Sequence, residues 1–278
     1  MPARAPCMLE YDFMVNAALA GTVVAVVAGV VGYLLVLRGQ TFAGHALSHV
    51  GFTGATGALL IGLPPLWGMV GVTVLGGVGM GLLGERAEGR DVAIGMVLSL
   101  SLGVGLLFLH FFTAYAAQAT ALLFGSVLGV DAGMIWTLLG LGVVSLVALA
   151  AIARPLLFAT LQPELAEARG VPMRLVSVLF LAVVALATAL CVQVVGVLLV
   201  FTLLVAPAAA AHRLAHRLGQ GVALSAALAV AQTWAGLALA YATDWPVSVW
   251  ITALGGAAYA LACLFTPEFT ATARPRES

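Results

Sequence analysis

The sequence has little charge and no lysine. Only 8% of its 278 residues are charged, whereas a soluble domain carries about 25%, so a water-soluble surface cannot be built from this composition. All eleven basic residues are arginine. A phosphate-binding P-loop requires the lysine of G-x-x-x-x-G-K-[ST]. The chain therefore contains no such loop, and an ATP-driven process would need its ATPase from another subunit.

The net charge and the cysteines further restrict the class of protein and its partners. The formal net charge is zero, so nothing in the composition suggests a nucleic-acid partner. The three cysteines, Cys7, Cys191 and Cys263, are scattered without C-x-x-C spacing, and we interpret them as small hydrophobic residues. The alternation of apolar and polar residues in segments of ~10 residues, which is typical of a membrane β-barrel, is also missing.

Long apolar runs dominate instead, and runs of ~20 residues match the ~30 Å hydrocarbon core of a bilayer. We therefore predict an all-α polytopic membrane protein with about nine transmembrane helices. The predicted spans are 13–37, 42–62, 65–84, 91–112, 132–153, 172–191, 195–212, 219–242 and 246–265. Residues 113–131 are too short for two crossings, and a re-entrant or interfacial segment there makes the count eight or nine. The whole chain, 1–278, is taken as one transmembrane domain, with a tail at 1–12, a helical bundle at 13–265 and a cytoplasmic tail at 266–278.

The arginines predict the orientation of this bundle. With the N-terminus outside, ten arginines fall on the cytoplasmic side and only Arg4 falls outside, as the positive-inside rule expects. Nine spans then place the C-terminus in the cytoplasm. The outer loops keep two acids, Asp131 and Asp244, which we interpret as residues of solvated loops, although they could also attract cations.

The longest predicted cytoplasmic loop contains a short, well-terminated helix at about 163–169. Pro163 suits the first turn, and Glu164 and Arg169 suit the helix dipole at the two ends. Gly170 fits the position just after the C-terminal cap. Such a helix is either a simple connector or a docking element for a cytoplasmic partner, and capping alone does not decide between them.

Two histidines, His45 and His49, stand four residues apart in "GHALSHVGF". On a helix this spacing puts both imidazoles on one face, where they can bind a metal ion. At 1.5 Å per residue, His49 lies ~16 Å beyond Arg38, near the middle of a ~30 Å core. The alternative is that each histidine only hydrogen-bonds a neighbouring helix.

Catalysis by this pair is disfavoured. Intramembrane zinc proteases use H-E-x-x-H, with the glutamate as general base, whereas Ala46 follows His45 here and no carboxylate lies within ten residues. A second pair, His212 and His216, is interleaved with arginines that would repel a divalent ion. We interpret that pair as a cationic helix end.

Four stretches of the sequence carry a resemblance to a known family. They are "LRGQTFAGHALSHVGFTG" at 37–54, "GRDVAIGMVLSLSLGVGLLFL" at 89–109, "ALLFGSVLGV" at 121–130, and "LQPELAEARGVPMR" at 161–174 followed by "VVGVLLVFTLLVAPAAAA" at 194–211. In this order the chain resembles, over about residues 15–265, the permease subunits of bacterial ABC importers for zinc, manganese and iron. These permeases work with cluster-type metal-binding proteins.

The resemblance implies partners and a place for the short helix. It implies a homodimer or paired permease in the lipids of the bacterial inner membrane, two cytoplasmic ABC ATPase subunits, and an extracytoplasmic metal-binding protein. The chain itself would be non-catalytic and would hold no permanent cofactor, since the metal ion is its substrate. The segment that would couple to the ATPase comprises Pro163, Glu164, Leu165, Ala166, Glu167, Ala168, Arg169 and Gly170.

One position departs from the family. The family commonly has an aspartate four residues before the histidine, and His45 stands there instead. The resemblance thus implies a transient transport site at His45 and His49 with two nitrogen donors, which favours zinc over manganese. A stand-alone secondary transporter or channel remains the alternative, although such proteins usually carry intramembrane acids for coupling ions, and none lies deep in a predicted span.

Overall fold

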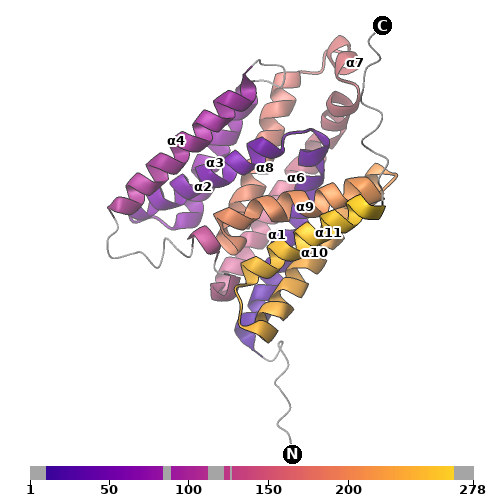
Figure 1. The fold of residues 1–278 in the computed structure, drawn as a ribbon. Helices are drawn as coiled ribbons and strands as arrows, with labels where there is room; N and C mark the ends of the chain where they lie inside the picture. The colour runs from indigo at the N-terminus through magenta and orange to yellow at the C-terminus, as the bar shows by residue number, and fades with distance from the viewer. Residues whose placement is uncertain (1–10, 84–88, 112–121, 126, 266–278) are drawn as a thin grey trace, which may run out of the picture.

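The computed structural model of the chain is a bundle of α-helices (Figure 1) and describes residues 11–83, 89–111, 122–125 and 127–265. No strand occurs in these residues, in agreement with the predicted all-α class. The helices are α1 (Asp12–Leu37), α2 (Thr41–Leu60), α3 (Pro65–Leu82), α4 (Arg90–His110), the 3-10 turn η2 (Val127–Gly129), α6 (Ala132–Leu161), α7 (Pro163–Ala168), α8 (Met173–Val195), α9 (Val197–Leu214), α10 (Leu218–Thr243) and α11 (Val247–Phe265).

Each of the nine predicted spans coincides with a long helix, and eight of these helices are long and apolar enough to cross a membrane. The exception is α2, which has 20 residues but includes two histidines, four glycines and three threonines. These residues lower its hydropathy without shortening it. The chain is thus an all-α polytopic membrane protein with eight candidate spans, and a ninth crossing by α2 remains a prediction.

The predicted end of one span is wrong. We expected a span at 132–153 to stop before Arg154-Pro155, but α6 continues through Pro155 to Leu161. A proline inside a helix removes one backbone hydrogen bond. The extension nevertheless buries Leu156 completely and Ala159 almost completely, so packing outweighs the lost bond. The predicted re-entrant segment, 113–131, lies largely outside the described residues, which show three helical residues at 122–124 and the turn η2 there.

The core is built around α1 and α8, the two helices whose apolar stretches are buried over most of their length. α8 packs on α3, and α1 packs on α9, α10 and α6. Small residues permit these close contacts. At Gly54 on α2, for example, an added Cβ would clash with the backbone oxygen of Gly68 on α3. Such a site admits only glycine.

The two ends of the bundle differ in chemistry. Contacts of Arg38 with Thr160, and of His212 with Tyr33, bring the ends of α1, α6 and α9 together. We call this the arginine end, and its residues are Arg38, Arg90, Arg154, Arg169, Arg174, Arg213 and Arg217. The opposite end, where α1 begins and α10 turns into α11, is the aromatic end, and its residues are Tyr11, Phe13, Tyr241, Trp245 and Trp250, with Asp131 and Asp244. α7 lies at the end of the bundle opposite the start of α1 (Figure 1).

Candidate functional site

The helix that carries His45 and His49 is enclosed by protein. α1 ends at Leu37, and Gly39, two residues further on, has a φ of +65°. Backbone bonds from Gly39 to Val36 and from Gln40 to Leu35 close the helix in the Schellman pattern. α2 starts two residues after Gly39 and packs on α3, α4, α8 and α9. Twelve of its 20 residues are buried. Its polar residues therefore face other helices rather than lipid.

The structure places the two histidines together, as the spacing predicts. Their ring centroids are 5.0 Å apart and the rings are nearly perpendicular. Both side chains are half-buried, and neither Nδ1 atom has a hydrogen-bond partner among the described residues. A buried, unpaired nitrogen lone pair or N–H is unfavourable. The pair is therefore not explained by hydrogen bonds that would join α2 to its neighbours through these atoms.

The third residue at this place is Phe201 on α9, which the sequence analysis missed. Its ring meets the His45 ring edge-on, with centroids 5.2 Å apart. This contact restricts the orientation of the His45 imidazole and covers one side of it with hydrocarbon. Phe201 lies inside one of the four family-like stretches, but nothing in its spacing relates it to His45, because α9 is brought to α2 only by the fold.

The site supplies two donors. Among the described residues, no group of three or more His, Cys, Asp or Glu side chains is close enough to hold a metal ion. Structural zinc sites are closed by four protein ligands, so two imidazoles bind an ion only loosely unless another chain completes the shell. Loose binding is what conduction requires, since the ion must also leave.

The short helix predicted at 163–169 is present as α7, Pro163–Ala168. Gly170 has a φ of +78°, and bonds run from its N–H to Glu167 and from the Val171 N–H to Ala166. These are the two bonds of a Schellman motif, so the predicted cap position of Gly170 is confirmed. Apart from the buried Ala166, the helix is exposed. It can therefore meet a partner without first leaving the bundle.

Arg38, which follows the last residue of α1, connects the turn between α1 and α2 to the end of α6, next to α7. The Arg38 Nη1 donates to Thr160 Oγ1 at 3.1 Å, three residues before α7, and the guanidinium lies over the Phe180 ring. Burial and the neighbouring Arg90 lower the pKa of Arg38 to about 10, so it stays protonated at neutral pH. The same residue thus joins the turn that precedes the histidine helix to the end of α6 that leads into α7.

His212 makes a structural contact with α1. Its ring stacks on Tyr33 with centroids 3.9 Å apart, and its Nε2 lies 2.9 Å from the Tyr33 backbone oxygen. Because that oxygen accepts, Nε2 carries the proton. This contact agrees with the interpretation of His212 as part of a helix end.

Comparisons with known proteins agree with this architecture. Residues 10–266 match the model of the family described as the ABC 3 transport family. The chain is 29% identical over 262 residues to the "Manganese transport system membrane protein MntC" of Halalkalibacterium halodurans, covering 94% of this chain and 90% of that protein. It is 32% identical to the "Probable metal transport system membrane protein" of Treponema pallidum, covering 84% of this chain and 88% of that protein.

A solved structure has the same fold. The structure titled "PsaBC from Streptococcus pneumoniae in complex with Fab" superposes with a TM-score of 0.83 at 25% identity and covers 94% of both chains. The family match spans nearly the whole bundle, so it includes both the histidine helix and α7. The chain belongs to the ABC 3 transport family and is the multi-pass, non-catalytic membrane permease of a bacterial ABC metal importer.

Proposed function

We propose that the chain moves a divalent transition-metal ion, with zinc favoured, past a transient site formed by His45 and His49. The observation that carries the proposal is the pair itself: two imidazoles on one face of a helix enclosed by protein, each with a buried Nδ1 that lacks a partner among the described residues. With metal–nitrogen bonds of about 2.0–2.1 Å, two imidazoles on a tetrahedral ion have ring centroids about 5 Å apart. The observed separation of 5.0 Å fits.

The choice of metal follows from the donors. Imidazole suits zinc, whereas manganese prefers carboxylate oxygens, and affinity for Mn²⁺ is the lowest of the divalent first-row series. Several relatives carry manganese in their names, so manganese is the rival substrate. A second copy of the permease, in a homodimer, would complete the metal shell in either case.

The test of the metal is an uptake competition. The permease is reconstituted with its ATPase and its extracytoplasmic binding protein, and ATP-driven uptake of radioactive zinc and manganese is measured. We expect zinc to be preferred, His45→Asp to shift the preference toward manganese, and His45→Ala with His49→Ala to abolish both. His216→Ala, at an exposed histidine of the arginine end, is the control. Unchanged uptake in the double variant, or a manganese preference that His45→Asp leaves unaltered, contradicts the proposal.

The ATPase is proposed to dock on α7. Pro163, Glu164 and Leu165 are exposed and line a surface hollow of about 420 Å³. The Arg38–Thr160 bond connects the end of α6, next to α7, to the turn that precedes α2. With the N-terminus outside and the C-terminus inside, the arginine end, including α7, faces the cytoplasm and the aromatic end faces the binding protein. This orientation agrees with the arginine bias.

Docking can be tested with two leucines of similar exposure. Leu165 is 45% exposed on α7, and Leu63 is 51% exposed in the turn between α2 and α3. We expect Leu165→Ser to weaken co-purification of the ATPase and to lower uptake, and Leu63→Ser to leave co-purification intact. Equal ATPase recovery with both variants would contradict docking at α7.

A further inference from the structure

A hollow of about 530 Å³ opens at the aromatic end, between the start of α1 and the turn that joins α10 to α11. The metal site and α7 do not use it. Its walls are aromatic near the rim and aliphatic farther in. The residues that matter here are Tyr11, Phe13, Tyr241, Asp244, Trp245 and Met14.

The aromatic rim is held in place by its own contacts. The Tyr11 ring lies 5.5 Å from Phe13 and 6.4 Å from Tyr241, centroid to centroid. The Trp245 indole stacks on Trp250 at 5.7 Å, and the Trp250 Nε1 donates to Thr243 Oγ1. Aromatic faces that are fixed around a hollow attract cations, in particular ammonium groups.

One carboxylate stands at this rim. Asp244 is exposed and has a φ of +58°, the left-handed value found at no other non-glycine among the described residues. The conformation ends α10 and places Asp244 beside Trp245 in the wall of the hollow. Among the described residues, those that line the hollow include no arginine or lysine, and Asp244 is their one acid. These residues therefore combine aromatic faces with one negative charge, and they favour a cationic ligand.

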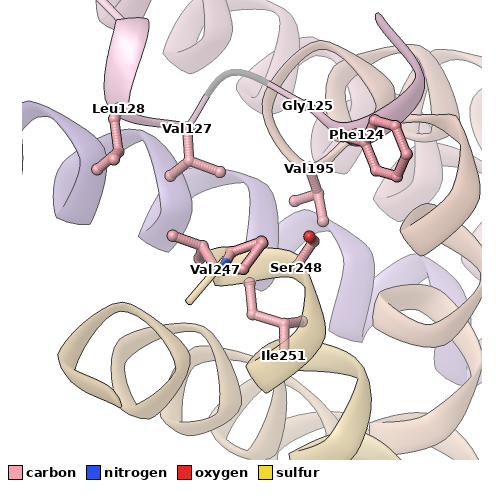
Figure 2. Close-up of a pocket in the computed structure, with 9 residues that line it drawn as sticks. Phe124, Gly125, Val127, Leu128, Val195, Val247, Ser248 and Ile251 are labelled. Carbon is pink, nitrogen blue, oxygen red and sulfur yellow. The ribbon is translucent and has the colours of Figure 1, made fainter. Parts of the chain in front are cut away.

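A second hollow of about 300 Å³ adjoins the first and shares Leu128, Pro246 and Val247 with it. Figure 2 shows it between Val127 and Val195 on one side and Val247 and Ile251 on the other. Apart from Ser248, the side chains that line it are apolar. The two hollows together provide an anionic, aromatic compartment next to an aliphatic one, and α11 begins between them at Val247.

We propose that these adjoining hollows bind a phospholipid whose headgroup carries an ammonium group, ethanolamine or choline. The ammonium lies among Tyr11, Tyr241 and Trp245 with Asp244 as its counter-charge. The phosphate lies at the start of α11, where the first backbone N–H groups point outward, and an acyl chain enters the apolar hollow. Aromatic side chains at this level of a membrane protein also suit the headgroup region.

The proposal commits to a lipid because the ligand must be amphipathic. A lysine or arginine side chain of a protein partner would satisfy the rim but would leave the apolar hollow unfilled. An anionic lipid such as phosphatidylglycerol would fill the apolar hollow but has no ammonium group, so it would leave Asp244 without a counter-charge. Only an ammonium-bearing lipid matches both compartments.

The experiment is native mass spectrometry of the purified full chain. The chain is incubated with phosphatidylethanolamine, phosphatidylcholine or phosphatidylglycerol of identical acyl chains, and the retained lipid is counted. We expect the ammonium lipids to be retained about tenfold more than phosphatidylglycerol, a difference of about 1.4 kcal/mol. Asp244→Asn and Trp245→Leu should each remove most of this preference.

Two matched variants control for folding and for general lipid contact. Asp131→Asn changes the other acid of the same end while keeping a side chain that caps α6 well, and Trp67→Leu removes a tryptophan of similar exposure, 56% against 59% for Trp245. Both should keep the preference. The preference is a ratio within one sample, so a general loss of fold lowers all three lipids together and is recognised as such.

Three results would overturn the proposal. The first is equal retention of the three lipids by the unaltered chain. The second is an unchanged preference in Asp244→Asn and Trp245→Leu. The third is an Asp244→Asn chain that retains the ammonium lipids but no longer binds the extracytoplasmic metal-binding protein, which would assign the rim to a protein partner.

Discussion

α2 and α4 are neighbouring helices of almost equal length, 20 and 21 residues, with opposite surroundings. α2 buries twelve of its residues, whereas α4 buries only Ile94 and Gly105. α4 is apolar enough to be recognised as a span and α2 is not. The comparison shows that α2 can carry polar residues because it contacts protein on most sides, whereas α4 presents most of its surface outward. The two histidines belong to the enclosed helix, α2.

The largest expected effect comes from closing the space beside α2. Gly54→Val places side-chain atoms where the Gly68 backbone oxygen now lies, and backbone cannot move aside as a flexible side chain can. We expect no folded, monodisperse protein in fluorescence-detected size exclusion. Gly103→Val on α4, where nothing lies within 4 Å, should elute like the unaltered chain. If both variants eluted alike, the proposed difference in packing between α2 and α4 would be wrong.

Truncating one leucine on each helix compares the burial of α2 and α4 as a difference in the free energy of unfolding. Leu47 on α2 is fully buried and Leu100 on α4 is 69% exposed. Leu47→Ala should lower the free energy of unfolding by about 2–5 kcal/mol, because the space it leaves cannot be filled by lipid. Leu100→Ala should change it little, since lipid fills the gap. The measurement is thermal unfolding in detergent, and a Leu100→Ala loss as large as that of Leu47→Ala would contradict the assignment of the faces.

Making α2 more like α4 should separate stability from function. His49→Leu removes a buried Nδ1 that lacks a partner among the described residues, and relieving such a group contributes about 1–3 kcal/mol. We expect a higher melting temperature in the presence of a metal chelator, together with lost metal uptake. His216→Leu, at an exposed histidine, should alter neither. A lower melting temperature for His49→Leu would mean that the imidazole has a structural partner.

The smallest expected effect concerns the polar link between the two helices. The Thr53 hydroxyl on α2 reaches the backbone oxygen of Ser101 on α4. Thr53→Val keeps the shape and removes the bond, which should reduce stability by about 0.6 kcal/mol, the mean for such bonds in membranes. Thr137→Val, whose hydroxyl bonds only within its own helix, should have no measurable effect in the same thermal assay.

Much of the fold follows from local sequence. The apolar runs locate the nine long helices to within a few residues at most ends, because length and hydropathy are properties of each segment alone. The cap at Gly170 is equally local, since its left-handed φ and the bonds around it involve only residues 166–171. The end of α6 could not be predicted in this way. Pro155 signals a stop, and only the burial of Leu156 by neighbouring helices explains why the helix continues.

The candidate site likewise has a part that follows from local sequence and a part that depends on tertiary packing. The i, i+4 spacing alone puts His45 and His49 on one face, because a helix repeats every 3.6 residues, and the structure has their rings 5.0 Å apart. Phe201 could not be found, since it comes from a helix more than 150 residues further along the chain and meets His45 only after packing. The lipid hollows are also beyond the sequence. Tyr11, Asp244 and Leu128 share a cavity because three distant segments meet at one end of the bundle.

The sequence by itself determined that this protein is a membrane bundle without its own P-loop, with a histidine pair on one helix and a capped helix at about 163–169. These properties depend on composition and on spacing within single helices. Only the tertiary structure decided that α2 is enclosed by four other helices, that Arg38 connects the turn before α2 to the end of α6, and that an acidic aromatic rim adjoins an apolar hollow. Those features depend on which helix faces meet, and in a bundle where almost every face is apolar, hydropathy does not distinguish one face from another.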